Sequence, residues 1–425
     1  MACITQVMTI QEVELNSTNH GSEVMEVPQH ITNMLPDGEL TMEQRTQTTA
    51  LLGRYVGQFP APGDPITGNT DAVLHDIDTV NTEPVRTPLI QLSPTKIQEQ
   101  EIKVAEMLRG GQIEPSDNLW SSPTVMVKKK DGTLRFCVNY RRLHCVTKKD
   151  ASPLPTINDS LSMLADQRWF STLDFASGYW QVGLTNRAKE RSAFATPAGL
   201  FQFKVMPFGL CNAPATFERL MSQVLRGLQW EHCLVYIDDI LVFGRSFDSS
   251  LDNLRSVLDR IAQYGLQLKS SKCALLRSSL PFLGHVVSRD GLQCNPEKIE
   301  PVNKWSVPTS VKAVHEFLEF TGYYRRFGPN FDSIAEPLNN LMEKTGTFHW
   351  NGLHQRVFDK LCHRLTSAPV LAFPRGDLEY TVDCDASNYG IGGVLLQVQD
   401  GAEHVIAYYS HALRESQRKY CTTKK

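Results

Sequence analysis

Two adjacent acids, Asp238 and Asp239, lie in the middle of an apolar run and constrain the fold more than any other feature of the chain. The run, CLVYIDDILVF, places β-branched and other apolar residues on both sides of them, which predicts two buried strands. Carboxylates are almost never fully buried unless they are paired or bind a metal. Taken alone, the pair is explained equally well by a metal site and by a tight hairpin turn, in which Asp is common.

The composition excludes several classes of protein. The chain has 425 residues, of which 41% are hydrophobic, and this is enough for two to four domains. It contains no apolar run of membrane-spanning length and no signal-peptide pattern. Its ten cysteines form no CxxC pair and no zinc-ligand spacing, which is typical of thiols in a reducing compartment.

The net charge of −3 hides an uneven distribution. Residues 1–100 contain 13 acids and 4 bases, so the rest of the chain carries a positive balance. The stretch Lys128–Lys149 contains eight bases and one acid. Such a stretch is either a solvated charged face or a surface that binds phosphate groups.

The order of the predicted elements indicates an α+β chain. Residues 1–90 are acidic and weakly periodic, which predicts an extended or partly disordered lead-in. A helix then begins at Ser93-Pro94, a hairpin turns at Asp131-Gly132, and NAPATFERLMSQVLRGL forms an amphipathic helix. The remaining predictions are a helix over residues 247–264, a strand LPFLGHVVS, mostly helices over 296–345 with an N-cap at Thr309-Ser310, and strands after Glu379.

A third acid, Asp174, ends the predicted strand WFSTLD, 64 residues before Asp238. A carboxylate at a strand end beside a carboxylate hairpin suits Mg²⁺, which takes oxygen ligands from a few carboxylates and from substrate phosphate. Two such ions about 4 Å apart can activate an attacking hydroxyl and stabilise a leaving pyrophosphate. The sequence has no GxSxG, Walker A or HExxH motif that would indicate another chemistry.

Five motifs, in order, resemble those of reverse transcriptases, most closely those of gypsy-type LTR retrotransposon pol polyproteins. They are KKKDGTLRFCVNYRRLH, LDFASGYWQV, MPFGLCNAPATFERLM, YIDDILVF and FLGHVVS. The resemblance implies an α+β right-hand polymerase fold (fingers, palm, thumb) followed by an incomplete RNase H-like β-sheet. It casts Asp174, Asp238 and Asp239 as the catalytic, metal-binding triad, with two Mg²⁺ ions, or Mn²⁺, as cofactors. Because adjacent hairpin residues point in different directions, we expect Asp239 to be a partial or indirect ligand.

The resemblance also implies residues that bind the nucleotide and the primer. The nucleotide-binding positions are Lys129, Arg135, Tyr179, Phe208, Gly209 and Lys272, and the primer-grip positions are Leu283 and Gly284. Lys129 and Arg135 would contact the triphosphate. Tyr179 would exclude a ribose 2′-OH, although without the motif it reads as a core aromatic. Lys272 would protonate pyrophosphate, and an ordinary surface lysine is an equal alternative.

Two positions depart from the family pattern, which usually has Asp and Asn where this chain has Asn139 and His144. Neither position binds metal in the family, so the departures concern the fingers rather than the chemistry. The Asp-Thr-Gly or Asp-Ser-Gly of a retroelement protease is absent, so residues 1–90 are not expected to be an intact protease.

The C-terminal segment resembles the start of an RNase H domain. VDCDASNYGIGGVLLQ matches its first hairpin, with Asp385 in the place of its first metal-binding carboxylate. The family supplies a catalytic glutamate next, and this sequence ends at Lys425. We therefore expect a truncated, inactive RNase H. The expected domains are a lead-in (1–90), fingers and palm (91–288), a helical thumb or connection (289–370) and the RNase H-like segment (371–425).

The predicted function is RNA-directed DNA polymerase, with an RNA or DNA template, a primer and dNTPs as partners. The resemblance implies a location in the cytoplasm, in virus-like particles or in the nucleus, and no membrane partner. A silent retroelement remnant that only binds nucleic acid is the first alternative. The second is an RNA-dependent RNA polymerase, against which Tyr179 and the RNase H-like segment argue.

Overall fold

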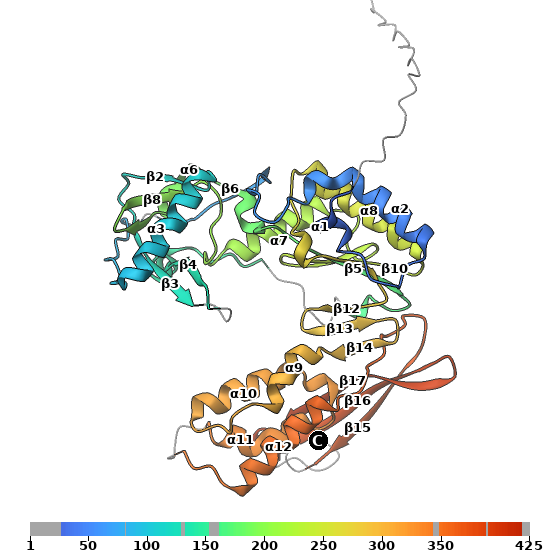
Figure 1. Ribbon diagram of the computed structural model, residues 1–425. Coiled ribbons are helices and arrows are strands. Elements are labelled where there is room, and N and C mark those ends of the chain that lie inside the picture. The colour runs from blue at the N-terminus through green and yellow to red at the C-terminus, as the bar shows by residue number, and fades with distance from the viewer. Residues whose placement is uncertain are drawn as a thin grey trace, which may run out of the picture.

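The structure is a computed structural model that describes residues 27–80, 82–128, 132–152, 161–342, 348–387 and 390–418. Two bodies are stacked in Figure 1, with residues up to about 278 above and the rest below. Both mix helices with sheets, and nearly all strand pairs are antiparallel, so the predicted α+β class is confirmed. Within the described ranges, no helix is both long and apolar enough to cross a membrane.

A four-stranded sheet, the central sheet, forms the middle of the upper body. Its strand order is β11-β5-β10-β9, all antiparallel. The strands are β5 (Trp169–Asp174), β9 (Cys233–Tyr236), β10 (Asp239–Gly244) and β11 (Ala274–Arg277). They are the predicted apolar runs, and two amphipathic helices, α7 (Ala213–Val224) and α8 (Phe247–Gln263), pack with them in one core.

A second sheet lies at the other end of the upper body (Figure 1), in the order β2-β8-β7-β3-β4. The strands are β2 (Ile113–Pro115), β3 (Ser122–Lys128), β4 (Leu134–Val138), β7 (Phe194–Thr196) and β8 (Gly199–Phe203). The helices beside it are α3 (Pro94–Arg109), α4 (Arg141–Val146) and α6 (Asn186–Arg191). The predicted helix from Ser93-Pro94 and the two strands around Asp131-Gly132 are confirmed, although residues 129–131 lie outside the described ranges.

The prediction of an extended, partly disordered lead-in is wrong for residues 27–80. This segment forms α1 (Gln29–Thr32), α2 (Met42–Leu52), the 3-10 helix η1 (Gly53–Gln58) and β1 (Thr70–His75). Eight of its large apolar residues are buried in the core that the central sheet and α8 share; they are Ile31, Met34, Leu35, Leu51, Leu52, Tyr55, Phe59 and Ile77. The low apolar content misled the prediction, because packing on an existing core needs only a few large side chains. A capping box between Thr41 and Gln44 was the local signal for α2.

The lower body begins with a three-stranded sheet, β12-β13-β14. Its strands are β12 (Ser279–Phe282), β13 (His285–Ser288) and β14 (Gly291–Cys294). The single strand predicted for LPFLGHVVS is therefore a hairpin, which turns at Leu283-Gly284. The helices that follow are α9 (Pro296–Asn303), α10 (Val311–Tyr323), the 3-10 helix η4 (Arg325–Phe327), α11 (Phe331–Asn340) and α12 (Gly352–Thr366). Ser310 caps α10 through Ala313, as predicted.

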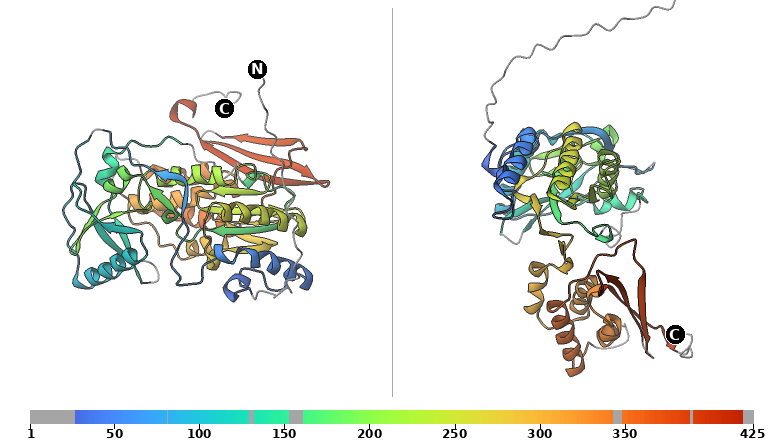
Figure 2. Two further views of the ribbon diagram at one scale, coloured as in Figure 1. Left: turned by 90° about the horizontal axis from the view of Figure 1, so that it is seen from above. Right: turned by 90° about the vertical axis from the view of Figure 1, so that its right-hand side faces the viewer.

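The last described elements are another three-stranded sheet, of order β15-β16-β17, and the short helix α13 (Glu415–Arg418). The strands are β15 (Tyr380–Ala386), β16 (Gly390–Gln399) and β17 (Ala402–Ala412). α11 packs against β17, whereas every residue of β15 is exposed. In both views of Figure 2 this sheet lies on the outside of the molecule. The helices therefore cover only part of it.

Candidate active site

Three carboxylates converge where β5, β9 and β10 meet. Asp174 ends β5 and is the cross-strand partner of Asp239, the first residue of β10. Asp239 is also opposite Tyr236 at the end of β9, so Ile237 and Asp238 form a two-residue hairpin turn. Like charges directly opposite each other in a sheet are destabilising. The buried strands thus hold acids together against their mutual repulsion.

The turn itself has unusual backbone geometry. Ile237 has φ of 58°, which a β-branched residue rarely adopts. Its backbone N–H donates to Oε2 of Glu218, on α7, over 3.3 Å. Burial raises the pKa of Glu218, and the hydrogen bond from Ile237 lowers it in part. Sequence analysis did not identify Glu218, because only the folded hairpin turn brings the backbone N–H of Ile237 next to its carboxylate.

The acids perturb one another and a lysine. Burial, then the charge of Asp174, raises the pKa of Asp238. Burial, then the charges of Asp238 and Asp174, raises the pKa of Asp239 to about 6. Nζ of Lys272 lies 2.8 Å from Oδ2 and 3.1 Å from Oδ1 of Asp174. Burial lowers the pKa of Lys272, but its hydrogen bond to Asp174 and the three negative charges outweigh this and raise it. The site attracts cations.

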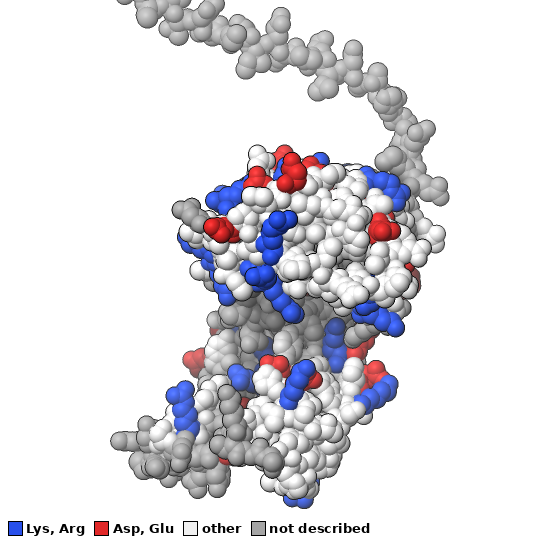
Figure 3. Space-filling model, turned by 90° about the vertical axis from the view of Figure 1, so that its left-hand side faces the viewer, with Lys and Arg blue, Asp and Glu red and all other residues white. Residues whose placement is uncertain are grey.

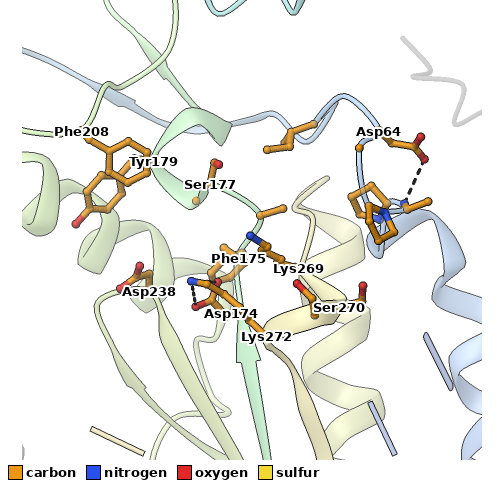
Figure 4. Close-up of a pocket in the computed structure, with 18 of the residues that line it drawn as sticks. Asp64, Asp174, Phe175, Ser177, Tyr179, Phe208, Asp238, Lys269, Ser270 and Lys272 are labelled. Carbon is orange, nitrogen blue, oxygen red and sulfur yellow. Dashed lines mark hydrogen bonds and ion pairs between the residues drawn. The ribbon is translucent and has the colours of Figure 1, made fainter. Parts of the chain in front are cut away.

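A cavity of about 630 Å³ opens above these acids (Figure 4). It brings together six of the residues predicted from the sequence, which are Asp174, Asp238, Arg135, Tyr179, Phe208 and Lys272. In Figure 4 the amine of Lys272 reaches Asp174, and the rings of Tyr179 and Phe208 lie above Asp238. Asp239 is not among the lining residues, in agreement with the expectation that adjacent hairpin residues point different ways.

An aromatic group forms one wall of the cavity. The ring of Tyr179 lies 5.2 Å from that of Phe208 and 5.4 Å from that of Phe217, between ring centroids. The guanidinium of Arg135 sits 5.4 Å from the centre of the Phe208 ring. Burial and the charge of Asp238 raise the pKa of Tyr179 to about 12. Tyr179 is thus both packed against the core and exposed to the cavity, so the two readings of this residue are compatible.

The opposite wall was not predicted. It is the loop Pro60–Ile66, together with Lys269, Ser270 and Ser271. Gln267 holds the base of this loop: its Oε1 accepts from the N–H groups of Thr67 and Gly68, and its Nε2 donates to the carbonyl of Gly57. The Pro/Gly-rich stretch PAPGDP signals a loop, but no sequence pattern shows that its partner lies 200 residues away.

The other predicted positions lie elsewhere. Gly209 follows Phe208 with φ of 93°, a conformation that requires glycine. Leu283 and Gly284 turn between β12 and β13 in the lower body, and Asp385 is exposed on β15, opposite Gly392. Lys129 lies outside the described residues. The cavity therefore unites two of the three acids with four of the six nucleotide-binding candidates, but not with Asp385.

The donor set suits Mg²⁺ in part. Across the described ranges, no three His, Cys, Asp or Glu side chains are close enough to form a complete ligand group by themselves. Mg²⁺ does not need one, because it commonly binds one or two carboxylates and completes its shell with substrate phosphates and water. Asp174 and Asp238 face one cavity, and the negative charge of Asp174 disfavours ionisation of Asp238. These two residues fit a site shared with a phosphorylated substrate.

Basic side chains lie on both rims of the hollow between the two bodies, with acidic side chains among them on the lower rim. Figure 3 shows Lys and Arg side chains on both its upper and its lower rim. The described basic residues of the stretch Lys128–Lys149 are all exposed; they are Lys128, Arg135, Arg141, Arg142, Lys148 and Lys149. Exposed bases at a concave surface favour binding of a polyanion.

Comparisons with protein families agree with this chemistry. Residues 127–287 match the family model described as reverse transcriptase (RNA-dependent DNA polymerase). Residues 350–425 match the RNase H-like domain found in reverse transcriptase. The second match includes α12, which precedes the segment 371–425 that the sequence suggested.

Curated relatives include Pol polyproteins of retrotransposons. Those of transposons 297 and opus of Drosophila melanogaster are each 33% identical to this chain over 91% of its length. The alignments span 36% and 40% of the two relatives. That of transposon 412 of the same organism is 29% identical over 89% of the chain and 31% of the relative. The chain thus spans about a third of the length of these relatives.

Solved structures show the same fold. A foamy viral protease-reverse transcriptase in complex with an RNA/DNA hybrid matches 97% of this chain and 55% of its own chain, with a TM-score of 0.82 and 22% identity. The same protein in complex with dsDNA matches 93% of this chain and 82% of its own, also with a TM-score of 0.82. The right-hand polymerase fold predicted from the motifs is confirmed.

Proposed function

We propose that the chain, which is similar to retrotransposon Pol polyproteins and matches the reverse transcriptase family model, is an RNA-directed DNA polymerase. It extends a primer 3′-OH with deoxynucleotides on an RNA or DNA template. The single observation that carries the proposal is the cavity, which unites Asp174 and Asp238 with Arg135, Lys272 and an aromatic wall. Acids for a cation, bases for a triphosphate and a flat surface for a sugar are what nucleotidyl transfer needs.

Asp174 and Asp238 would hold the two divalent ions, Mg²⁺ or Mn²⁺, that the family uses. Bound there, the ions supply Lewis-acid stabilisation of the charge that develops on the attacking and leaving oxygens. Asp239, the cross-strand partner of Asp174, does not line the cavity but adds its negative charge to the site. Burial raises the pKa values of Asp238 and Asp239 most, and repulsion among the acids raises them further; a bound cation would relieve that repulsion.

The other residues of the cavity orient the nucleotide. Arg135 and Lys272 contact its phosphates, as does Lys129, and charge-assisted hydrogen bonds of this kind are stronger than neutral ones. Lys272 exchanges its present partner, Asp174, for the triphosphate when substrate binds, and holds a proton for the leaving pyrophosphate. The ring of Tyr179, fixed between Phe208 and Phe217, excludes a 2′-OH.

The nucleic acid occupies the hollow between the two bodies. The basic rims seen in Figure 3 face the phosphates, and the turn Leu283-Gly284 acts as the primer grip. The structural relatives bound to an RNA/DNA hybrid and to dsDNA support this assignment. Affinity then comes mainly from phosphate contacts and falls with salt.

The proposal assigns fingers and palm to residues 91–288, a helical thumb or connection to 289–370 and an RNase H-like segment to 371–425. We also propose that residues 1–425 alone do not cleave RNA, because in the described part of the chain no group of three acidic, histidine or cysteine side chains forms around Asp385 on the exposed strand β15. As part of a retrotransposon Pol protein, the chain acts in the cytoplasm, in virus-like particles or in the nucleus.

A primer-extension assay on an RNA template, with deoxynucleotides and ribonucleotides compared, tests the function. The proposal requires Mg²⁺-dependent extension with deoxynucleotides. Binding of template-primer without extension would instead identify a silent remnant, and extension with ribonucleotides would identify an RNA-dependent RNA polymerase.

A further inference from the structure

Two consecutive tyrosines bind two consecutive carbonyls of the turn between β12 and β13. The hydroxyl of Tyr323 donates to the carbonyl of Leu283 over 2.6 Å. The hydroxyl of Tyr324 donates to the carbonyl of Gly284 over 3.0 Å. Each tyrosine lies 40 residues after its partner, at the end of α10, so these bonds join the helical part of the lower body to the hairpin.

The turn is one that needs support. Leu283 has φ of 47° and Gly284 has φ of 76°, as in a type I′ hairpin turn. Gly at the second position is favoured there, whereas Leu at the first is strained. A Cβ on Gly284 would meet Tyr323 at 3.4 Å and the Tyr324 hydroxyl at 3.5 Å. The tyrosines therefore pack directly over the backbone that they bind.

His285 completes the support. Its Nδ1 lies 2.9 Å from the carbonyl of Leu283, which only accepts, so Nδ1 carries the proton. Burial lowers the pKa of His285, and its ring lies 5.4 Å from that of Tyr323 and 5.6 Å from that of Tyr324. The carbonyl of Leu283 thus receives two hydrogen bonds. That of Gly284 also receives two, the second from the N–H of Asn295 over 3.3 Å.

The two tyrosines differ in exposure. Tyr324 is 4% exposed and belongs to the core, whereas Tyr323 is 44% exposed. Burial raises the pKa of Tyr323, and the phenol of Tyr236 raises it further. Tyr236 ends β9, directly before the turn that carries Asp238. Tyr323 therefore binds the Leu283-Gly284 turn and is near enough to Tyr236 for the two phenols to interact electrostatically.

We propose that Tyr323 is a positioning residue for the primer terminus, which it keeps in register with Asp174 and Asp238 by fixing the carbonyl of Leu283. This role rests on the proposed polymerase function and on the primer-grip assignment of the turn. Tyr324 and His285 hold the same turn from within the core. Tyr323 is the exposed member of the group, so its hydroxyl can be removed with little loss of packing.

The test compares Tyr323→Phe with Tyr409→Phe in the full chain, since Tyr409 is an exposed tyrosine in a different sheet, on strand β17. Single-turnover insertion of one dNTP at saturating template-primer should fall about tenfold in Tyr323→Phe, the size expected for one lost hydrogen bond that aligns reacting groups. The Kd for template-primer, the Kd for dNTP and the Tm should stay within the range of the Tyr409→Phe control.

A second readout does not need turnover. A primer with 2-aminopurine at its 3′ end, bound to the enzyme without dNTP, should change its fluorescence in Tyr323→Phe but not in Tyr409→Phe, because the terminus is less fixed. A wild-type rate together with unchanged fluorescence would overturn the inference. So would a lower rate that accompanies a lower Tm with unchanged fluorescence, since Tyr323 would then only stabilise the fold.

The two proposals fail separately. A wild-type chain that binds the aminopurine primer but does not extend it contradicts the polymerase function, and the fluorescence comparison then decides the role of Tyr323. A wild-type chain that extends primers, with an equally active Tyr323→Phe variant, contradicts only the role of Tyr323.

Discussion

The carboxylate of Glu218 accepts the backbone N–H of Ile237, the residue with positive φ at the start of the catalytic turn. A β-branched residue persists in this conformation only when its surroundings hold it there, and Glu218 on α7 is the polar contact that does so. Since Asp238 is the next residue, the direction of its carboxylate depends on this bond. The position of Asp238, a proposed catalytic acid, is thus set by a side chain that does not line the cavity.

Replacing Glu218 with Ala should therefore reduce primer extension, whereas Glu218→Gln should not. Ala removes the carboxylate that accepts the N–H of Ile237, and losing this hydrogen bond destabilises the turn by about 1 to 3 kcal/mol. The amide oxygen of Gln can still accept. We expect extension rates about five- to tenfold lower for Ala than for Gln, at equal template affinity. Equal rates for the two variants would show that the turn does not need this bond.

Asp238→Asn should abolish primer extension and leave folding and template binding nearly intact. The change keeps the side-chain volume, removes one negative charge from the proposed ion site and relieves the repulsion with Asp174 that, after burial, raises the pKa of Asp238. Extension with Mg²⁺, circular dichroism and template binding measure the three properties. Asp385→Asn, on the exposed strand β15, is the control and should extend normally. Wild-type extension by Asp238→Asn would refute the metal-site assignment.

Tyr179→Val should increase ribonucleotide insertion relative to deoxynucleotide insertion. The two sugars differ only in the 2′-OH, so discrimination here must be steric. Tyr179→Phe keeps the ring against Phe208 and Phe217 and should keep the selectivity. Single-nucleotide insertion with each sugar gives the ratio. If Val and Phe variants discriminate equally, Tyr179 serves only as a core aromatic.

The stability of the upper body should fall with acid through His75. This residue is 1% exposed, its Nδ1 lies 2.8 Å from Oγ1 of Thr216, and burial lowers its pKa to about 4. An unfolded histidine has a pKa of about 6.5, so the unfolded state binds more protons between the two values. Stability is therefore fully present above about pH 6.5 and is lost as the pH falls toward 4, by up to about 3 kcal/mol.

Urea unfolding of the wild type and of His75→Gln across this pH range measures the effect. The variant should be less stable at neutral pH, because it loses the packing of the imidazole, but its stability should depend less on pH. An equal loss in both proteins between pH 6.5 and 4 would assign the acid sensitivity to other groups.

Local patterns predicted the centre of the fold well. Strands β5, β9 and β10 are short apolar runs, and the acids lie at their ends, so the position of Asp174 beside Asp238 and Asp239 followed from strand pairing. Helices α7 and α8 followed from their apolar faces. These features depend on residues that are near one another in sequence, or on the pairing of β10 with β5.

Contacts between distant segments could not be predicted in the same way. The loop Pro60–Ile66 reaches the cavity because Gln267 binds its base. The sequence of neither segment indicates that the two are in contact. The hairpin at Leu283-Gly284 was missed because Leu is rare at positive φ, and the tyrosines that hold it come 40 residues later. In both places tertiary hydrogen bonds decide the local structure.

A protein of residues 1–425 should not cleave the RNA strand of an RNA–DNA hybrid. Two-metal hydrolysis needs several carboxylates around the ions. Asp383 and Asp385 alternate on β15 and can share one face of that strand, but all of β15 is exposed. In the part of the chain that the structure describes, no further acid or histidine joins them in a ligand group. One strand cannot surround two ions.

The experiment incubates this protein with a labelled RNA–DNA hybrid and Mg²⁺ or Mn²⁺, and follows the RNA strand. We expect it to remain intact under conditions in which the same preparation extends a primer, because no group of three possible metal ligands forms around Asp385 in the described residues. The Asp385→Asn variant distinguishes RNA cleavage by this chain from cleavage by a contaminating nuclease. Cleavage that persists in this variant comes from a contaminating nuclease. Cleavage that disappears in it would contradict the prediction and would mean that a second copy of the chain supplies the missing carboxylates at the exposed strand β15.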